Sequence, residues 1–345
     1  MKRSVIICTY QAPRELDFAL CALARQSLMP DEVMVADDGS DEGTQAVVEE
    51  WRSRVPFRLD HCWHVDRGYR KARIVNEAVR RSTGEHLLFL DGDSFPHPHW
   101  VADHAAAYRP RRALCGRRVK LGPDLSCRVT RDDVASGQFD GVTGTLVKSA
   151  LRGDTKRLGL GIRVPQAIAR MFHPRPRRLM GVNFSLGREV FYSVNGLNER
   201  WTFYGREDYD LELRLRRSRI ELYPLLNRGI VYHMHHIERT RSTEALELVA
   251  QMEQSNEARC ELGVEIRPCS TLQANPPGKP AQAICEHFSA DFATSAGNSE
   301  CSTETLSAAT SRCRRSTRPW AWPASNLWVI SPRLTDGTTV PTGTT

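Results

Sequence analysis

The sequence predicts an α/β protein built on a mostly parallel, doubly wound sheet with helices packed on its faces. The first observation is the order of elements, because short apolar runs alternate with stretches whose apolar residues recur at helical spacing. The second is that three of these runs end in polar or acidic residues, as strands do where a ligand binds at the edge of a parallel sheet. Strand, helix and strand repeated in this way favour a parallel sheet with crossover helices.

The central strand is expected at residues 87–90, where the apolar run LLFL is followed directly by Asp91, Gly92 and Asp93. A short apolar run of this kind is typical of a strand buried on both faces. Two carboxylates separated by a glycine suit a hard divalent cation that keeps open positions for phosphate oxygens. The alternative is a solvated Asp-Gly-Asp turn.

The other elements of the first half follow from the same periodicities. Ser40 is expected to cap the helix that carries Val47, Val48 and Trp51. Further strands are expected at residues 4–8, 32–36, 57–65 and 113–121, and further helices at 14–26, 72–82 and 99–108.

Polar residues at the strand ends face one predicted crevice. Thr9 and Tyr10 follow the first strand, and Asp37 and Asp38 follow the second, where a carboxylate is placed to accept hydrogen bonds from a base or ribose. Each of the two acids is alternatively a helix cap.

A basic loop precedes the helix at 72–82. Arg70, Lys71 and Arg73 are candidates for contacts to a diphosphate, because guanidinium groups bind phosphate oxygens bidentately. The alternative, a solvated helix start, is disfavoured because positive charge at a helix N-terminus opposes the helix dipole.

The second half begins with a basic segment of weak periodicity, residues 121–180. We interpret it as a variable excursion over the active site, with an amphipathic helix around 164–172 that binds an acceptor or lies on an anionic membrane face. A plain solvated loop is the alternative. Strands are then expected at 180–186, 221–224 and 229–232, with a short helix at 188–194.

Glu207 and Asp208 begin a further predicted helix, in which acidic residues also favour the dipole of the N-terminal turn. The functional interpretation is that Asp208 is a general base and that Glu207 holds the acceptor. His233 follows the last predicted strand, and a histidine there would complete a metal site with the Asp pair.

Composition sets further limits. Lysine and arginine number 48 against 41 acids, and the excess after residue 110 favours anionic partners. Neither a P-loop nor a Gly-x-Gly-x-x-Gly motif follows the first strand, which argues against P-loop enzymes and dinucleotide dehydrogenases. The N-terminal apolar run is too short for a signal peptide, and no run approaches the roughly 18 residues of a membrane span. We therefore expect a cytoplasmic protein, in peripheral contact with the inner face of the plasma membrane.

Residues 267–345 change in character, with Pro, Ser, Thr, Cys and Arg and no regular periodicity. This composition predicts a disordered tail and resembles an out-of-frame translation.

Eight short motifs occur in the order found in inverting nucleotide-sugar glycosyltransferases of family 2, which residues 1 to about 240 resemble. The second half is similar to the galactosyltransferase-type segment of bacterial chondroitin polymerase. The motifs are CTY at 8–10, DDGS at 37–40, GYRKA at 68–72, DGD at 91–93, GVNFS at 181–185, NGLNE at 195–199, GRED at 205–208 and HMHH at 233–236.

The resemblance implies a Rossmann-like GT-A fold and a division of the chain. Residues 1–120 would be the nucleotide-sugar-binding half and 181–266 the acceptor-binding and catalytic half, joined by the excursion at 121–180 and followed by the tail at 267–345.

The resemblance also implies roles for single residues. The base and ribose would contact Thr9, Tyr10 and Asp38, the diphosphate would contact Arg70 and Arg73, and Asn183 would belong to the donor site. Asp93 and His233 would ligate Mn²⁺ or Mg²⁺, with Asp91 on the ribose or a metal-bound water and His236 as the alternative histidine ligand. Asp208 would deprotonate the acceptor hydroxyl.

The implied activity is metal-dependent transfer of a sugar, with inversion, from a nucleotide diphosphate donor, a UDP-sugar, to a glycan or glycolipid in surface polysaccharide biosynthesis. The sequence departs from the family at two places. Residues 203–205 are Phe-Tyr-Gly where many relatives have Gly-Trp-Gly, a departure that concerns the acceptor. Asn198 stands where relatives have Asp, a departure that we interpret as neutral.

Two alternative functions remain open on the sequence. One is a basic module that binds membranes or nucleic acid without catalysis, although basic clusters without interleaved aromatic residues speak against nucleic acid. The other is a synthase that loads sugar onto a polyprenyl phosphate, which normally has membrane-anchoring helices.

Overall fold

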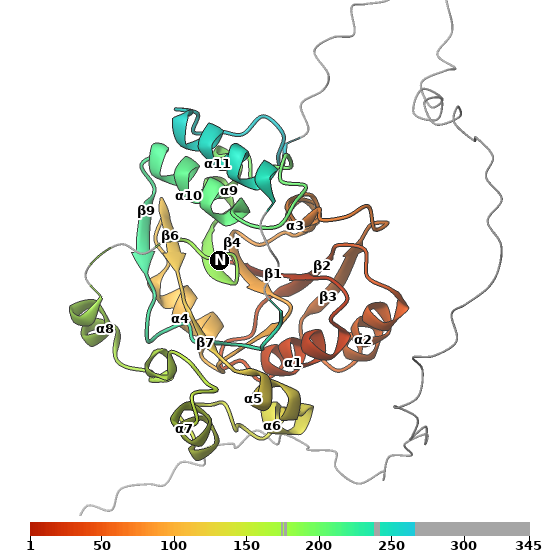
Figure 1. The fold of residues 1–345 in the computed structure, drawn as a ribbon, viewed down its shortest axis with the longest axis vertical. Helices are drawn as coiled ribbons and strands as arrows, with labels where there is room; N and C mark the ends of the chain where they lie inside the picture. Colours follow the sequence, from red (N-terminus) through yellow and green to blue (C-terminus); the bar gives the residue numbers. More distant parts are fainter. Residues whose placement is uncertain (174, 176–177, 238–241, 266–345) are drawn as a thin grey trace, which may run out of the picture. The chain divides into compact units, whose positions relative to one another are not determined.

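The core of the computed structural model is a twisted sheet of seven strands (Figure 1). The structure describes residues 1–173, 175, 178–237 and 242–265. Within them the strand order is β3-β2-β1-β4-β8-β6-β9, and only β8 runs antiparallel to its neighbours. The strands are β1 (Arg3–Thr9), β2 (Glu32–Asp37), β3 (Arg58–Trp63), β4 (His86–Asp91), β6 (Arg112–Cys115), β8 (Asn183–Gly187) and β9 (Glu221–Pro224). The predicted α/β class with a mostly parallel sheet is confirmed.

The central strands are apolar on both faces because both faces are covered. Along β4, Leu88 and Leu90 belong to one core cluster, while Leu87 and Phe89 belong to the other, as the two-residue period of a strand requires. Helices α1 (Pro13–Leu23) and α2 (Glu42–Arg52) contribute to the first cluster, and helices α3 (Lys71–Arg81), α9 (Arg188–Ser193) and α10 (Glu207–Arg217) contribute to the second.

A second, three-stranded sheet carries the histidine motif to the end of β4. Its central strand β10 (Val231–His233) pairs antiparallel with β5 (Ser94–Pro96) and parallel with β7 (Arg118–Lys120). Through this register His233 lies opposite Ser94, next in sequence to Asp93. The histidine motif and the Asp-Gly-Asp turn, far apart in sequence, are thereby brought to one place.

The strand expected at 113–121 is instead two strands in different sheets. The break falls at Gly116, whose backbone N–H donates to the carbonyl of Asn183 at 3.0 Å. A Cβ at residue 116 would lie 2.3 Å from Nδ2 of Asn183, so the close approach requires glycine.

The segment 121–180 is packed, and the plain-loop alternative is wrong. It forms α5 (Pro123–Arg128), α6 (Arg131–Ala135), α7 (Gly144–Leu151), a 3-10 turn η1 (Leu158–Gly161) and α8 (Gln166–Phe172). Its side chains Leu125, Val134, Phe139 and Leu146 join the core cluster of α1. Polar contacts reinforce the packing, since the Arg131 guanidinium pairs with the carboxylates of residues 17 and 50.

Two other details differ from the sequence expectation. Asp41, not Ser40, caps α2, and its carboxylate accepts from the N–H of Gly43. Helix α4 (Trp100–Ala107) lies within the predicted range, whereas α11 (Thr243–Gln254) was not predicted. The predicted tail lies outside the described residues, among which no helix is long and apolar enough to cross a membrane.

Candidate functional site

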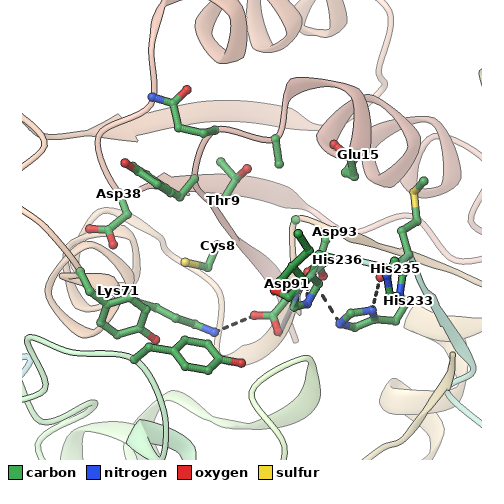
Figure 2. A pocket seen from close by; sticks show the side chains of 18 of the residues that line it. Cys8, Thr9, Glu15, Asp38, Lys71, Asp91, Asp93, His233, His235 and His236 are labelled. Carbon is green, nitrogen blue, oxygen red and sulfur yellow. Dashed lines mark hydrogen bonds and ion pairs between the residues drawn. The ribbon is translucent and has the colours of Figure 1, made fainter. Parts of the chain in front are cut away.

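A cavity of about 630 Å³ opens where β1, β2 and β4 end, beside the chain that follows β10 (Figure 2). Its size is in the range usual for small-molecule sites. The structure brings together seven predicted residues in its lining, and an eighth that the basic loop suggested: Thr9, Tyr10, Asp38, Asp91, Asp93, His233 and His236, with Lys71.

Asp93, His233 and His236 form a cluster with the geometry of a metal site. Their ligand atoms all lie within 4.8 Å of one another. The Oδ2 atom of Asp93 is 3.7 Å from Nε2 of His233 and 3.3 Å from Nε2 of His236. Figure 2 shows the two rings beside Asp93 at one end of the cavity.

Both rings are oriented by backbone carbonyls. Nδ1 of His233 lies 2.6 Å from the carbonyl oxygen of Met234, and Nδ1 of His236 lies 3.0 Å from that of Ile237. A neutral ring whose Nδ1–H donates to a carbonyl has its lone pair on Nε2, the atom that faces Asp93. Burial lowers the pKa of His233, which favours the neutral form that a metal needs. The donor set therefore fits a divalent cation.

Asp91 is held by a buried lysine. Nζ of Lys71 lies 2.7 Å from Oδ1 of Asp91 and 3.5 Å from Oε1 of Glu207. Burial disfavours the charged lysine, but the two carboxylates outweigh it and hold the pKa of Lys71 well above its usual value. Lys71 therefore acts as a counter-ion that links the end of β4 to the start of α10.

The floor of the cavity is formed by close backbone contact between β1 and the Asp-Gly-Asp turn. The N–H of Gly92 donates to the carbonyl of Cys8 at 2.7 Å, and a Cβ at Gly92 would lie 2.9 Å from Cβ of Thr9. Oγ1 of Thr9 is buried and has no hydrogen-bond partner among the described residues. Because buried hydroxyls normally find a partner, this atom is available to a ligand.

Asp38 connects the cavity to the basic loop. Its carboxylate accepts from the backbone N–H of Arg70 at 2.9 Å and lies 2.8 Å from Nε2 of His64. Burial raises the pKa of Asp38. The neighbouring Asp37 is fully buried, and its carboxylate accepts from the N–H of Ser40. It is not the helix cap of the alternative interpretation, because Asp41 caps α2.

The predicted catalytic pair lies beside the cavity and does not line it. Glu207 accepts from the Tyr69 hydroxyl at 2.9 Å, and Tyr69 lines the cavity with Tyr204, their rings meeting edge to face at 6.0 Å. Asp208 accepts from the N–H of Gly181 at 3.1 Å. Burial and the neighbouring Glu207 raise the pKa of Asp208 to about 6.

Three residues predicted to contact the donor lie outside the cavity lining. Asn183 is fully buried, and its amide group hydrogen-bonds the carbonyls of residues 117 and 229 and the side chains of Trp100 and His104. Its amide therefore positions the backbone around β8. Arg70, the N-cap residue of α3, is outside the cavity lining. Arg73, an exposed residue of the same helix, is outside it as well.

Sequence reasoning missed Arg118, which lines the cavity from β7. Arg118 lies opposite Val231 of β10, and this pairing could not be predicted because β7 was taken as part of a longer strand. None of the described residues of segment 121–180 lines the cavity, and its expected place over the active site stays a prediction.

Comparison with known proteins agrees with this architecture. Residues 4–169 match the profile of glycosyl transferase family 2, and residues 167–237 match that of the N-terminal domain of galactosyltransferase. The chain is 29% identical over 265 residues to validoxylamine A glucosyltransferase of Streptomyces hygroscopicus subsp. limoneus, covering 74% of this chain and 53% of the relative. It is 32% identical over 224 residues to chondroitin synthase of Escherichia coli, covering 62% of this chain and 32% of the relative.

A solved mannosyltransferase from Pyrobaculum calidifontis, in complex with GDP-Man and Mn²⁺, aligns with a TM-score of 0.45 and 15% identity, covering 74% of this chain and 70% of that one. The two profile matches place the chain among glycosyltransferases with the GT-A fold. The chain thus carries a glycosyl transferase family 2 region at residues 4–169, followed by a galactosyltransferase-type region at residues 167–237. It spans about half the length of the first relatives that it matches, 53% and 57%.

Proposed function

We propose that this protein is a metal-dependent glycosyltransferase of the hexosyltransferase type. It would move a sugar from a nucleotide diphosphate donor, a UDP-sugar, to a hydroxyl of a glycan or glycolipid, with inversion, in the synthesis of a surface polysaccharide. The observation that carries the proposal is the cluster of Asp93, His233 and His236 beside Asp91, at the strand ends of a cavity of about 630 Å³. The match of residues 4–169 to the family profile supports the class of reaction.

In this proposal different residues bind the different parts of the donor. Asp93, His233 and His236 would hold Mn²⁺ or Mg²⁺, which supplies a Lewis acid for the departing diphosphate. Arg118, in place of Arg70 and Arg73, contacts the diphosphate from β7. Thr9, Tyr10 and Asp38, which also line the cavity, contact the base and ribose; Figure 2 shows Thr9 and Asp38 away from the two histidines.

Asp208 is the proposed general base. The acceptor oxygen attacks the anomeric carbon, the bond from that carbon to the diphosphate oxygen breaks, and the acceptor's proton passes to the Asp208 carboxylate. Attack opposite the leaving group inverts the anomeric centre. A carboxylate with its pKa raised to about 6 is a stronger base than an ordinary aspartate and is still ionised at neutral pH.

The acceptor is proposed to stack on Tyr204, whose ring lines the cavity next to Tyr69. Aromatic faces pack well on the apolar faces of sugars. Glu207 lies directly behind Tyr69, within hydrogen-bond distance of its hydroxyl, and positions this wall. A glycolipid acceptor would be presented at a membrane, which agrees with the expected peripheral contact.

The test is nucleotide release from a panel of UDP- and GDP-sugars with Mn²⁺, Mg²⁺ or EDTA, and the anomeric configuration of any product by NMR. We expect release with one donor class, loss of release in EDTA, and an inverted product. Asp208→Asn should abolish transfer, whereas Glu253→Gln, an exposed residue bonded to the Tyr209 hydroxyl, should leave it unchanged. Retention of configuration, or full activity in Asp208→Asn, would refute the mechanism.

A further inference from the structure

Two helices of the segment 121–180 expose apolar side chains in rows. On α7, Val147 and Leu151 are one turn apart and are 38% and 83% exposed. On α8, Met171 and Phe172 are 79% and 73% exposed, and Ile168, one turn earlier, is 41% exposed. Single exposed apolar residues are ordinary, but rows of them on two helices of one segment mark an interaction surface.

Each of these helices also has a buried side, so the exposed rows are not a sign of loose packing. Leu146 of α7 is fully buried and Ala169 of α8 is 5% exposed. In Figure 1, α7 and α8 project from the margin of the molecule, with the 3-10 turn η1 between them in the chain. The rows thus belong to well-anchored helices that turn an apolar side outward.

The same stretch is strongly basic. Residues 141–173 contain six lysines and arginines and a single acid, Asp154. The Asp154 carboxylate accepts hydrogen bonds from the Ser149 hydroxyl and the N–H of Leu125, so it is engaged within the fold. An apolar row flanked by cations is the arrangement of helices that lie in the interface of an anionic bilayer.

A groove of about 260 Å³ adjoins the apolar row of α7. Arg128, Lys148 and Arg152 line it, together with the apolar side chains of Val129 and Phe139. Asp133, the acid in its lining, is engaged in the capping box of α6 with Thr130. Three cations around a partly apolar hollow fit a phosphate group attached to a lipid.

We propose that α7, α8 and this groove form a docking surface for a bilayer containing anionic phospholipid. Leu151, Met171 and Phe172 enter the interface, and Arg128, Lys148 and Arg152 bind headgroup phosphates. Charge complementarity selects this occupant, because an apolar protein partner would not require the cations. The inference goes beyond glycosyl transfer, since lipid binding by this surface is independent of turnover in the cavity.

The test is flotation of the full chain with vesicles of mixed phosphatidylglycerol and phosphatidylcholine, compared with vesicles of phosphatidylcholine alone. We expect binding to the mixed vesicles that weakens with added salt. Leu151→Ser combined with Phe172→Ser should weaken it by about tenfold or more, because the inserted apolar area is lost. Lys148→Ser combined with Arg152→Ser should also weaken binding to the mixed vesicles, because two positive charges that attract the anionic headgroups are lost. Leu246→Ser, at a 57% exposed position on α11, is the matched control and should bind as the wild type does.

Equal binding to neutral vesicles, or unchanged binding by both double variants, would overturn the proposal. Displacement by dextran sulfate with no flotation on vesicles would also overturn it, and would indicate an acidic glycan as the occupant. Thermal melts establish that the variants are folded. Transfer to a soluble acceptor should be unchanged in the double variants, so a failure of lipid binding is distinguishable from a failure of the proposed enzyme activity.

Discussion

Lys71 is the residue on which the geometry of the cavity most depends. Its ammonium group lies between the carboxylates of Asp91 and Glu207, which belong to elements more than 100 residues apart in the chain. The sequence suggested a phosphate contact for Lys71, because it stands in a basic loop before a helix. The structure shows a counter-ion instead, since no sequence pattern reveals which acids a long side chain will reach.

Replacing Lys71 by Met should leave two partly buried carboxylates without their cation. We expect a loss of unfolding free energy of about 3 kcal/mol and a larger loss of activity, because Asp91 would no longer be held at the cavity. Denaturant titration and kcat/KM measure the two effects. Lys71→Arg keeps the charge and should recover most of the stability; equal stability of Lys71→Met and the wild type would refute this role.

The pKa of Asp208 sets the acid limb of the pH profile that we expect for kcat/KM of the proposed reaction. Because burial and Glu207 raise that pKa to about 6, the carboxylate takes up a proton as the pH falls through 6, and kcat/KM should fall with it. The groups facing Asp208 are the carboxylate of Glu207, the ammonium of Lys71 and the N–H of Gly181.

Glu207→Gln removes the like charge beside Asp208 and should move the acid limb to lower pH, whatever its effect on the rate. The pH profile of kcat/KM for the two proteins measures this shift. An unchanged limb in Glu207→Gln would show that another group carries it.

At the scale of elements, the turn after β4 depends on close contact with β1. Gly92→Ala places a Cβ 2.9 Å from Cβ of Thr9, which is too close. The turn should therefore shift and displace the aspartates on either side of residue 92. We expect a cost of about 1 to 3 kcal/mol in unfolding free energy and a marked loss of nucleotide affinity. Gly144→Ala, where an added Cβ meets nothing within 4 Å, is the control. Wild-type nucleotide affinity in Gly92→Ala, measured by calorimetry, would contradict this account.

The parallel strands β1, β2 and β4 could be predicted from the sequence because each is a dense apolar run followed by a turn residue. Strand β3 gives a weaker signal, since its sequence is RLDHCW. The three-stranded sheet could not, since β5, β7 and β10 have three residues each and the break at Gly116 depends on a backbone contact with Asn183. The metal cluster was predictable for Asp93 and His233 through the family resemblance. Arg118 and the burial of Asn183 depend on pairings between distant strands, which a single sequence does not specify.

At the scale of the whole molecule, a buried histidine pair makes the fold sensitive to acid. His86 and His104 both lie within hydrogen-bond distance of the Ser185 hydroxyl. Burial lowers the pKa of His86 to about 3 and that of His104 to about 4. At a pH between these lowered pKa values and the ordinary histidine pKa near 6.5, the two histidines bind protons in the unfolded chain but not in the folded chain.

Stability should therefore be complete above about pH 6.5 and decline as the pH falls toward 4. Urea titrations across this range measure the decline. His104→Gln should be less stable at pH 8 but should show a shallower decline, whereas His235→Gln, at an exposed position, should keep the wild-type slope. An identical slope in His104→Gln would show that the histidine pair does not cause the decline.

The most direct test of the central claim is calorimetric titration of UDP into the protein with and without Mn²⁺, for the wild type and Asp93→Ala. We expect binding that requires Mn²⁺ in the wild type and is lost in Asp93→Ala, while Asp60→Ala, a carboxylate on β3 outside the cavity lining, binds normally. UDP binding that is indifferent to Mn²⁺, or that survives in Asp93→Ala, would contradict the proposed metal-dependent nucleotide site.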